Sequence, residues 1–217
     1  MINKILSDKT LIALYKKYSD SYAAAFLVEE IGSYLTDQLK NEPAHVDLLV
    51  TLALTYLLTP VDDFETSEQY CRKALEIEAV EIRSKLILAY IYDHHLGELP
   101  DDILEMILPV DSSDNKLMSA KYLFVARYYF NKDDTLKYRE NLNKALGYFD
   151  GNQAARRCLY NYTKSQYDEN NIKIVQEVKF YSTEYWKERE MAYPTGIIDF
   201  DFFLCDKVFL LTEDFVL

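Results

Sequence analysis

The chain has 217 residues, of which 49% are apolar and 28% are charged, and its formal net charge is −12. A chain of this length buries roughly 70% of the surface that it exposes when unfolded, and its three widely spaced cysteines indicate neither a structural zinc site nor a redox dithiol. The start, MINKILSDKT, lacks an apolar core of signal-peptide length. The longest nearly apolar stretch, residues 48–58, is shorter than the roughly 20 residues of a membrane helix. We therefore expect a cytoplasmic protein without a membrane partner.

Apolar residues recur at helical spacing along nearly the whole chain, and only five glycines and five prolines interrupt it, which predicts an all-α fold. The first two helices are marked by apolar positions from Ile5 to Tyr15 and from Tyr22 through Phe26 to Leu35. The other helices are expected at 46–58, 64–77, 80–95, 101–108, 114–131, 133–149, 152–168 and 171–190. Because the loops are short, consecutive helices should pair as antiparallel hairpins.

One pattern of large, small and aromatic residues occurs more than once. In the clearest copy, VARYY at 125–129 is followed by LNKAL at 142–146. An earlier copy pairs LALTY at 52–56 with CRKAL at 71–75, and its spacings are two residues longer. The small residues let the two helices of a hairpin approach closely, while the tyrosine fills the groove to the next hairpin.

Two weaker copies begin with LAYIY at 88–92 and CLYNY at 158–162. The second residues of the four copies are separated by 36, 37 and 33 positions, at Ala53, Ala89, Ala126 and Leu159. The pattern resembles the tetratricopeptide repeat. That resemblance implies a short right-handed solenoid of stacked antiparallel hairpins over 1–195, best matched at 46–180, with a concave groove that binds peptides or proteins. A non-repetitive helical bundle is the alternative.

The last residues, GIIDFDFFLCDKVFLLTEDFVL, depart from the repeat. They alternate as a strand would at Ile198, Phe200 and Phe202, and then show helical spacing. Stacked hairpins need a terminal cap, so residues 196–217 are expected to cover the last hairpin within the same domain. Two questions stay open: whether 197–217 form a strand or a helix, and whether they help to grip a partner instead.

Negative charge is concentrated in one part of the chain. Residues 41–115 carry sixteen carboxylates and four Lys or Arg, which accounts for the whole net charge, and residues 86–115 carry seven carboxylates and no Lys or Arg. Nucleic acid is an unfavourable partner for such a chain because phosphate contacts need clustered Lys and Arg. A basic protein is the partner that this charge would attract. The alternative is that the acidic residues only keep the chain soluble.

The stretch DHHLGELPDD at 93–102 is the strongest candidate for a chemical site, and it fails the tests for one. Adjacent histidines on a helix point ~100° apart, and Gly97 is expected to end the helix before Glu98 can join His94. The chain has no glycine-rich phosphate loop and no nucleophile elbow. We therefore expect no catalytic residue, no metal site and no cofactor. The stretch instead reads as the turn of a helical hairpin and part of a binding face.

These observations predict a non-enzymatic protein-binding protein. By analogy of class only, the leading hypothesis is an acidic immunity protein that neutralises a basic toxin domain such as a nuclease. The alternative is a tetratricopeptide-type adaptor or peptide-sensing regulator. The residues expected to contact the partner are Asp47, Asp62, Asp63, Tyr90, Asp93, His94, Glu98, Asp101, Asp102 and Glu105.

Overall fold

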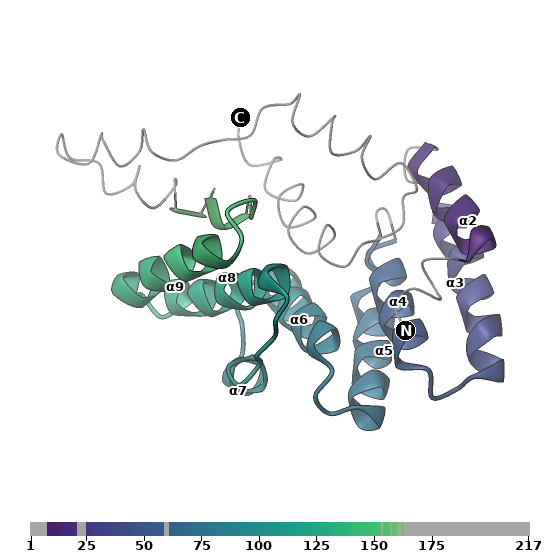
Figure 1. Ribbon diagram of the computed structural model, residues 1–217, viewed down its shortest axis with the longest axis horizontal. Helices are drawn as coiled ribbons and strands as arrows, with labels where there is room; N and C mark the ends of the chain where they lie inside the picture. Colours follow the sequence, from purple (N-terminus) through teal and green to yellow (C-terminus); the bar gives the residue numbers. More distant parts are fainter. Residues whose placement is uncertain are drawn as a thin grey trace. The chain divides into compact units, whose positions relative to one another are not determined.

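The computed structural model describes residues 8–20, 25–58, 61–152, 154–156, 158, 159 and 162, and all regular secondary structure in these ranges is helical (Figure 1). The all-α prediction is therefore confirmed for this part of the chain. The chain divides into two compact units, with the boundary between Ile91 and Tyr92. The helix expected at 171–190, the cap expected at 196–217 and the expected boundary between 195 and 196 lie outside the described residues.

The helices lie close to their expected positions. The first unit contains α2 (Lys9–Asp20), α3 (Ala25–Asn41), α4 (Val46–Tyr56), α5 (Phe64–Ile77) and α6 (Ile82–Ile91). The second contains the π-helical turn η1 (Tyr92–Leu96), α7 (Asp101–Ile107), α8 (Asn115–Asn131) and α9 (Thr135–Tyr148). Of the helix expected at 152–168 only scattered positions are described; 154–156, 158, 159 and 162 are helical, and Asn152 is not.

Helix α4 forms the centre of the first unit. It packs against α3 on one side and α5 on the other, and it also touches α6. Its sequence, VDLLVTLALTY, is apolar nearly all round, as expected for a helix with neighbours on several sides. The buried hydroxyl of Tyr15 on α2 lies 2.8 Å from Oγ1 of Thr55 on α4, so both of these buried polar groups have a partner. Burial raises the pKa of Tyr15.

The buried face of α3 differs by one position from the expected one. Phe26, expected to face the core, is 61% exposed, whereas Leu27 and Val28 are fully buried. The buried positions Leu27, Val28, Ile31 and Leu35 follow one another at intervals of one, three and four residues, and they form a single stripe. Phe26 is five residues before Ile31, which places it about 140° away from that position around the helix.

Close approach between α3 and α4 depends on a glycine. A Cβ atom at Gly32 on α3 would lie 2.9 Å from the hydroxyl oxygen of Tyr56, which is the last residue of α4 and of the LALTY motif. The Tyr56 ring also stacks on Tyr70 of α5, with 5.9 Å between ring centroids. The tyrosine of this motif therefore contacts the preceding helix α3 and its hairpin partner α5, whereas the pattern predicted that it would fill the groove to the next hairpin.

The loops of the α4–α5 and α8–α9 hairpins end with the same local geometry. Asp62 and Asp133 both adopt positive φ angles, 42° and 56°. The next residue in each loop, Asp63 or Asp134, caps the following helix by accepting a hydrogen bond of 3.0 Å from the backbone N–H three residues further on. The α4–α5 loop, at 57–63, is four residues longer than the α8–α9 loop, at 132–134, and the shared geometry lies at the end of both loops.

The same two hairpins share a second structural feature. In each hairpin a buried serine donates a hydrogen bond of 2.8 Å to the carbonyl of the motif alanine on the other helix, from Ser67 to Ala53 and from Ser119 to Ala145. All four side chains are fully buried. Such contacts need backbones that lie close together, and the small residues permit this. The serine is on the second helix of the first hairpin and on the first helix of the other.

The cap of α9 predicts an acid-dependent contribution to stability. The backbone N–H of Lys137 donates to the Asp134 carboxylate, and this holds the pKa of Asp134 below its ordinary value of 3.8. The stabilisation is therefore present above pH 3.8 and is lost as the pH falls through the lower pKa of the folded state. Asparagine keeps the capping hydrogen bond but does not titrate. We expect Asp134→Asn to lose less stability than the unaltered chain between about pH 5 and about pH 2, measured by urea unfolding. Parallel pH profiles would contradict this assignment.

Candidate partner-binding surfaces

The stretch at 93–102 forms the predicted turn. Residues Tyr92–Leu96 complete a π-helical turn, and Gly97 follows with φ +75°, in the left-handed region that favours glycine. Pro100 precedes α7, which begins at Asp101. The interpretation of this stretch as a turn between helices, in which Gly97 ends one and the Pro-Asp-Asp sequence opens the next, is confirmed.

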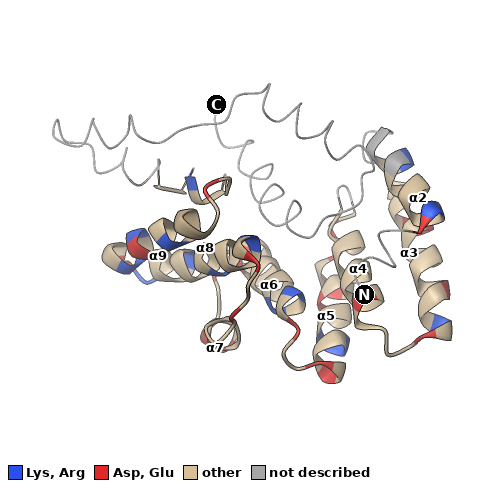
Figure 2. Ribbon diagram, viewed as in Figure 1, with Lys and Arg blue, Asp and Glu red and all other residues tan. Residues whose placement is uncertain are grey.

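Helix α7 has one buried and one acidic face. Ile103, Leu104 and Ile107 are buried, whereas the carboxylates of α7 and of Glu98, which precedes it, are exposed. The exposed acidic side chains are Glu98, Asp101, Asp102 and Glu105, which we call the α7 acidic surface, and His94 is exposed beside them in the sequence. Within the described ranges, none of Glu98, Asp102 and Glu105 has an ion-pair partner. Figure 2 shows acidic residues on α7 and basic residues on α8 and α9.

One carboxylate of this surface is partly neutralised by α8. The Tyr128 hydroxyl donates a hydrogen bond of 2.9 Å to Asp101, which raises the pKa of Tyr128, and the Lys132 ammonium lies 3.6 Å from the same carboxylate. The Asn131 side chain donates to the Gly97 carbonyl at 3.0 Å. The 86–115 window lacks Lys and Arg in sequence, but α8 brings a cation to it in space.

Asp93 is buried and paired rather than exposed. Its side chain is 5% exposed, and its Oδ2 atom lies 2.5 Å from Nε of Arg127 on α8. Burial lowers the pKa of Arg127, but the neighbouring Asp93 carboxylate more than compensates, so the pKa is raised overall. The other predicted contact residue that is buried is Tyr90, at 2% exposure. Neither side chain lies on the surface of this structure.

The remaining predicted residues lie in the first unit. Asp62 and Asp63 belong to the α4–α5 loop and are half-buried, and Asp63 serves as the cap of α5. Asp47 lies in the first turn of α4 and forms an ion pair of 2.7 Å with Arg83 on α6. The ten predicted residues therefore do not form one patch within either unit. The α7 acidic surface is the part of the set that is exposed and contiguous in the chain.

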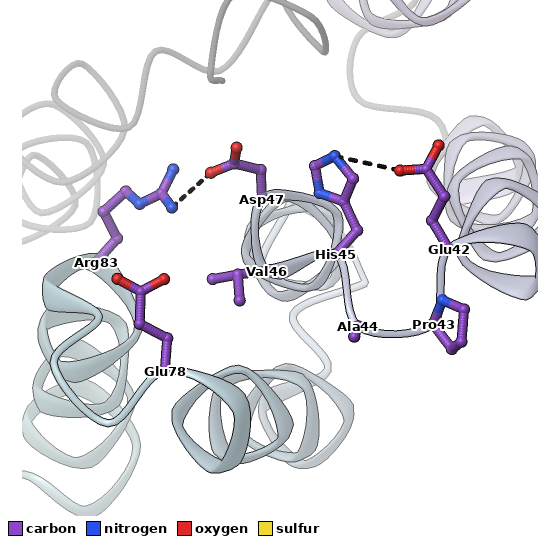
Figure 3. A pocket seen from close by; sticks show the side chains of 8 residues that line it. All are labelled: Glu42, Pro43, Ala44, His45, Val46, Asp47, Glu78 and Arg83. Atoms are coloured by element: carbon purple, nitrogen blue, oxygen red, sulfur yellow. Dashed lines mark hydrogen bonds and ion pairs between the residues drawn. The ribbon is translucent and has the colours of Figure 1, made fainter.

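Asp47 also belongs to a pocket that sequence reasoning did not assemble. This cavity of about 670 Å³ lies among the ends of helices in the first unit, and Figure 3 shows the residues that line it. They are Glu42, Pro43, Ala44, His45, Val46, Asp47, Glu78 and Arg83. His45 directly precedes the helix expected at 46–58 and is the N-cap of α4: its Nδ1 atom accepts from the backbone N–H of Leu48 at 3.4 Å.

The Arg83 guanidinium in the pocket is bonded to two carboxylates. Arg83 donates from Nη2 to Asp47 at 2.7 Å and from Nε to Glu81 at 2.6 Å. Burial lowers the pKa of Arg83, but Glu81 and Asp47 raise it further than burial lowers it. Asp47 and Arg83 are 36 residues apart, the same spacing as Ala53 and Ala89. They thus occupy equivalent positions in consecutive copies of the repeat pattern, which is the sequence signal that could have paired them.

Cysteine and metal chemistry gain no support within the described part of the chain. There, no group of three or more His, Cys, Asp or Glu residues is placed to hold a metal ion. Cys71 and Cys158 are free thiols, and burial raises the pKa of both, which keeps them in the less nucleophilic protonated form. Cys205 lies outside the described residues. Of the helices that the structure describes, none has the length and apolar character needed to cross a bilayer.

Comparison with known proteins gives no family for this chain. No protein-family model matches the chain, and a search of curated proteins found no match.

Proposed function

We propose that this chain is a cytoplasmic, non-enzymatic protein that binds a basic protein domain and blocks its action. The leading partner is a toxin domain that acts on nucleic acid, which would make the chain an immunity protein. The observation that carries the proposal is the α7 acidic surface, in which Glu98, Asp102 and Glu105 are exposed and have no ion-pair partner among the described residues. A protein that cleaves nucleic acid binds phosphates with Lys and Arg, and exposed carboxylates are complementary to such a surface.

Charge of this kind acts mainly on the rate of association. Attraction between opposite potentials can raise association rates toward ~10⁸–10⁹ M⁻¹s⁻¹ at low salt. An inhibitor must reach its toxin before the toxin reaches nucleic acid, so a fast association rate is useful for this function. The chain also contains 19 tyrosines, a residue type that is enriched at the energetic centres of protein interfaces.

We further propose that the hairpins belong to a tetratricopeptide-like solenoid. Two shared features support this architecture. An aspartate with a positive φ angle occurs in the loop of each hairpin, at Asp62 and Asp133, and a serine–alanine hydrogen bond joins the two helices of each hairpin. The same features favour a second candidate function, an adaptor or regulator that binds a short peptide in a groove. An adaptor would bind the isolated peptide and would not protect cells from any toxin.

The test is whether this chain forms a complex with the C-terminal domain of the protein whose gene lies immediately upstream of its own. We expect that domain to be basic and toxic when expressed alone, and co-expression of this chain to restore growth. The purified proteins should form a complex at low ionic strength, and the association rate should fall steeply as salt is added. The absence of a complex at low salt, where attraction is strongest, would contradict the proposal.

A further inference from the structure

The pocket in the first unit has one apolar edge and carboxylates on both sides. In Figure 3, Glu78 and Glu42 lie on opposite sides of the cavity, with Val46 and Ala44 along one edge between them and Asp47 and His45 along the other. Both glutamates are exposed, so both carboxylates are accessible from solvent. Pro43, Ala44 and Val46 supply the uncharged edge of the cavity. This combination suits a ligand with an apolar stem and a charged end.

The charge balance of the cavity determines the sign of that ligand. Arg83 is the one Lys or Arg among the lining residues, and its guanidinium is already bonded to Asp47 and Glu81. Its charge is therefore more than cancelled by these two carboxylates. Glu78 has no ion-pair partner among the described residues, and Glu42 faces the Nε2 atom of His45 at 3.8 Å. An anionic ligand would meet a surplus of carboxylates here, and a cation would be attracted.

We infer that this pocket receives an arginine side chain of the protein partner. The inference rests on the proposed function because it takes the partner to be a basic protein. The methylene groups of the arginine lie along Pro43, Ala44 and Val46, and its guanidinium donates to the carboxylates on either side. Arginine fits this cavity better than lysine because its planar group has five donors spread over a wider span.

The experiment uses the full chain and a small probe, the methylamide of N-acetylarginine, at low ionic strength. Binding is followed through the imidazole resonances of His45, a side chain that lines the cavity. We expect saturable shifts with the arginine probe and much smaller shifts with the citrulline analogue, which has the same shape and no charge. Glu78→Gln should weaken binding of the arginine probe about tenfold, because it removes a charged hydrogen-bond acceptor. Glu42→Gln should act in the same direction.

The matched control is Glu76→Gln, which removes an equal charge from an exposed position of α5 that does not line the cavity. It should leave the affinity for the arginine probe unchanged. Equal shifts with arginine and citrulline, or equal effects of the Glu78 and Glu76 variants, would overturn the inference. The probe needs no protein partner, so the two proposals can fail separately. Arginine binding without any toxin complex contradicts the proposed function, whereas a toxin complex without arginine binding contradicts only the role of this pocket.

Discussion

Replacing Arg127 by methionine is expected to lower the free energy of unfolding by about 3 kcal/mol. The substitution removes the partner of Asp93, a carboxylate that is 5% exposed, and leaves an uncompensated charge inside the second unit. The value is at the lower end for a buried pair because the Arg127 side chain is itself 30% exposed. The measurement is urea unfolding at neutral pH, with circular dichroism to confirm that the folded state is helical.

The control for this prediction is an exposed ion pair of the same chemistry. Arg72 pairs with Glu68 at 2.6 Å one helical turn apart on α5, and the two side chains are 49% and 28% exposed, against 30% and 5% for Arg127 and Asp93. Arg72→Met should therefore cost less than about 1 kcal/mol. Removing both charges of the buried pair, with Asp93→Leu added to Arg127→Met, should recover part of the lost stability. An Arg127 variant no less stable than the Arg72 variant would show that Asp93 is not held by this pair.

Reversing the charge of the α7 acidic surface is expected to slow association with the basic domain by about ten- to a hundredfold at low salt. The variant carries lysine at Glu98, Asp102 and Glu105, the three carboxylates that lack an ion-pair partner among the described residues. Asp101 is left in place because it accepts a hydrogen bond from Tyr128. The dependence of the association rate on salt should also become flatter. Stopped-flow fluorescence over a range of salt concentrations measures both quantities.

A matched variant separates local steering from total charge. Glu29, Glu30 and Asp37 are exposed residues of α3, outside the acidic window, and their replacement by lysine changes the net charge by the same amount. This variant should slow association much less than the α7 variant, because interactions between exposed charges fade beyond the Debye length of about 10 Å. Equal slowing by the two variants would mean that the acidic residues act through net charge alone.

The helices could be predicted from the sequence because their signals are local. Apolar spacing placed nearly every described helix within a few residues, and Gly97 correctly marked the end of a helix. The one-residue difference on α3 arose because Phe26 is large and apolar, which outweighed the regular stripe of smaller residues beginning at Leu27. The position of Phe26 around the helix determined its exposure more than its hydrophobicity did.

The candidate sites were less predictable because they depend on partners far apart in the chain. Asp93 looked like a surface carboxylate, since its own window contains no Lys or Arg, but Arg127 reaches it from 34 residues away. The pocket was missed for a similar reason: its residues come from two loops and two helices that share no local motif. Its central ion pair, Asp47 with Arg83, was visible only as a repeat spacing. Charge counted along a sequence does not measure charge at a surface.

The Asp47–Arg83 ion pair also limits how this chain can be lengthened by tandem duplication. The two residues occupy equivalent places in consecutive copies of the pattern, but one is an acid and the other a base. If residues 47–82 were duplicated in tandem, an aspartate would stand where Arg83 now stands for the first copy, and two carboxylates would face each other. Like charges at that separation repel. Neighbouring copies in this unit are therefore not interchangeable, and a lengthened array would need an arginine installed at each new junction.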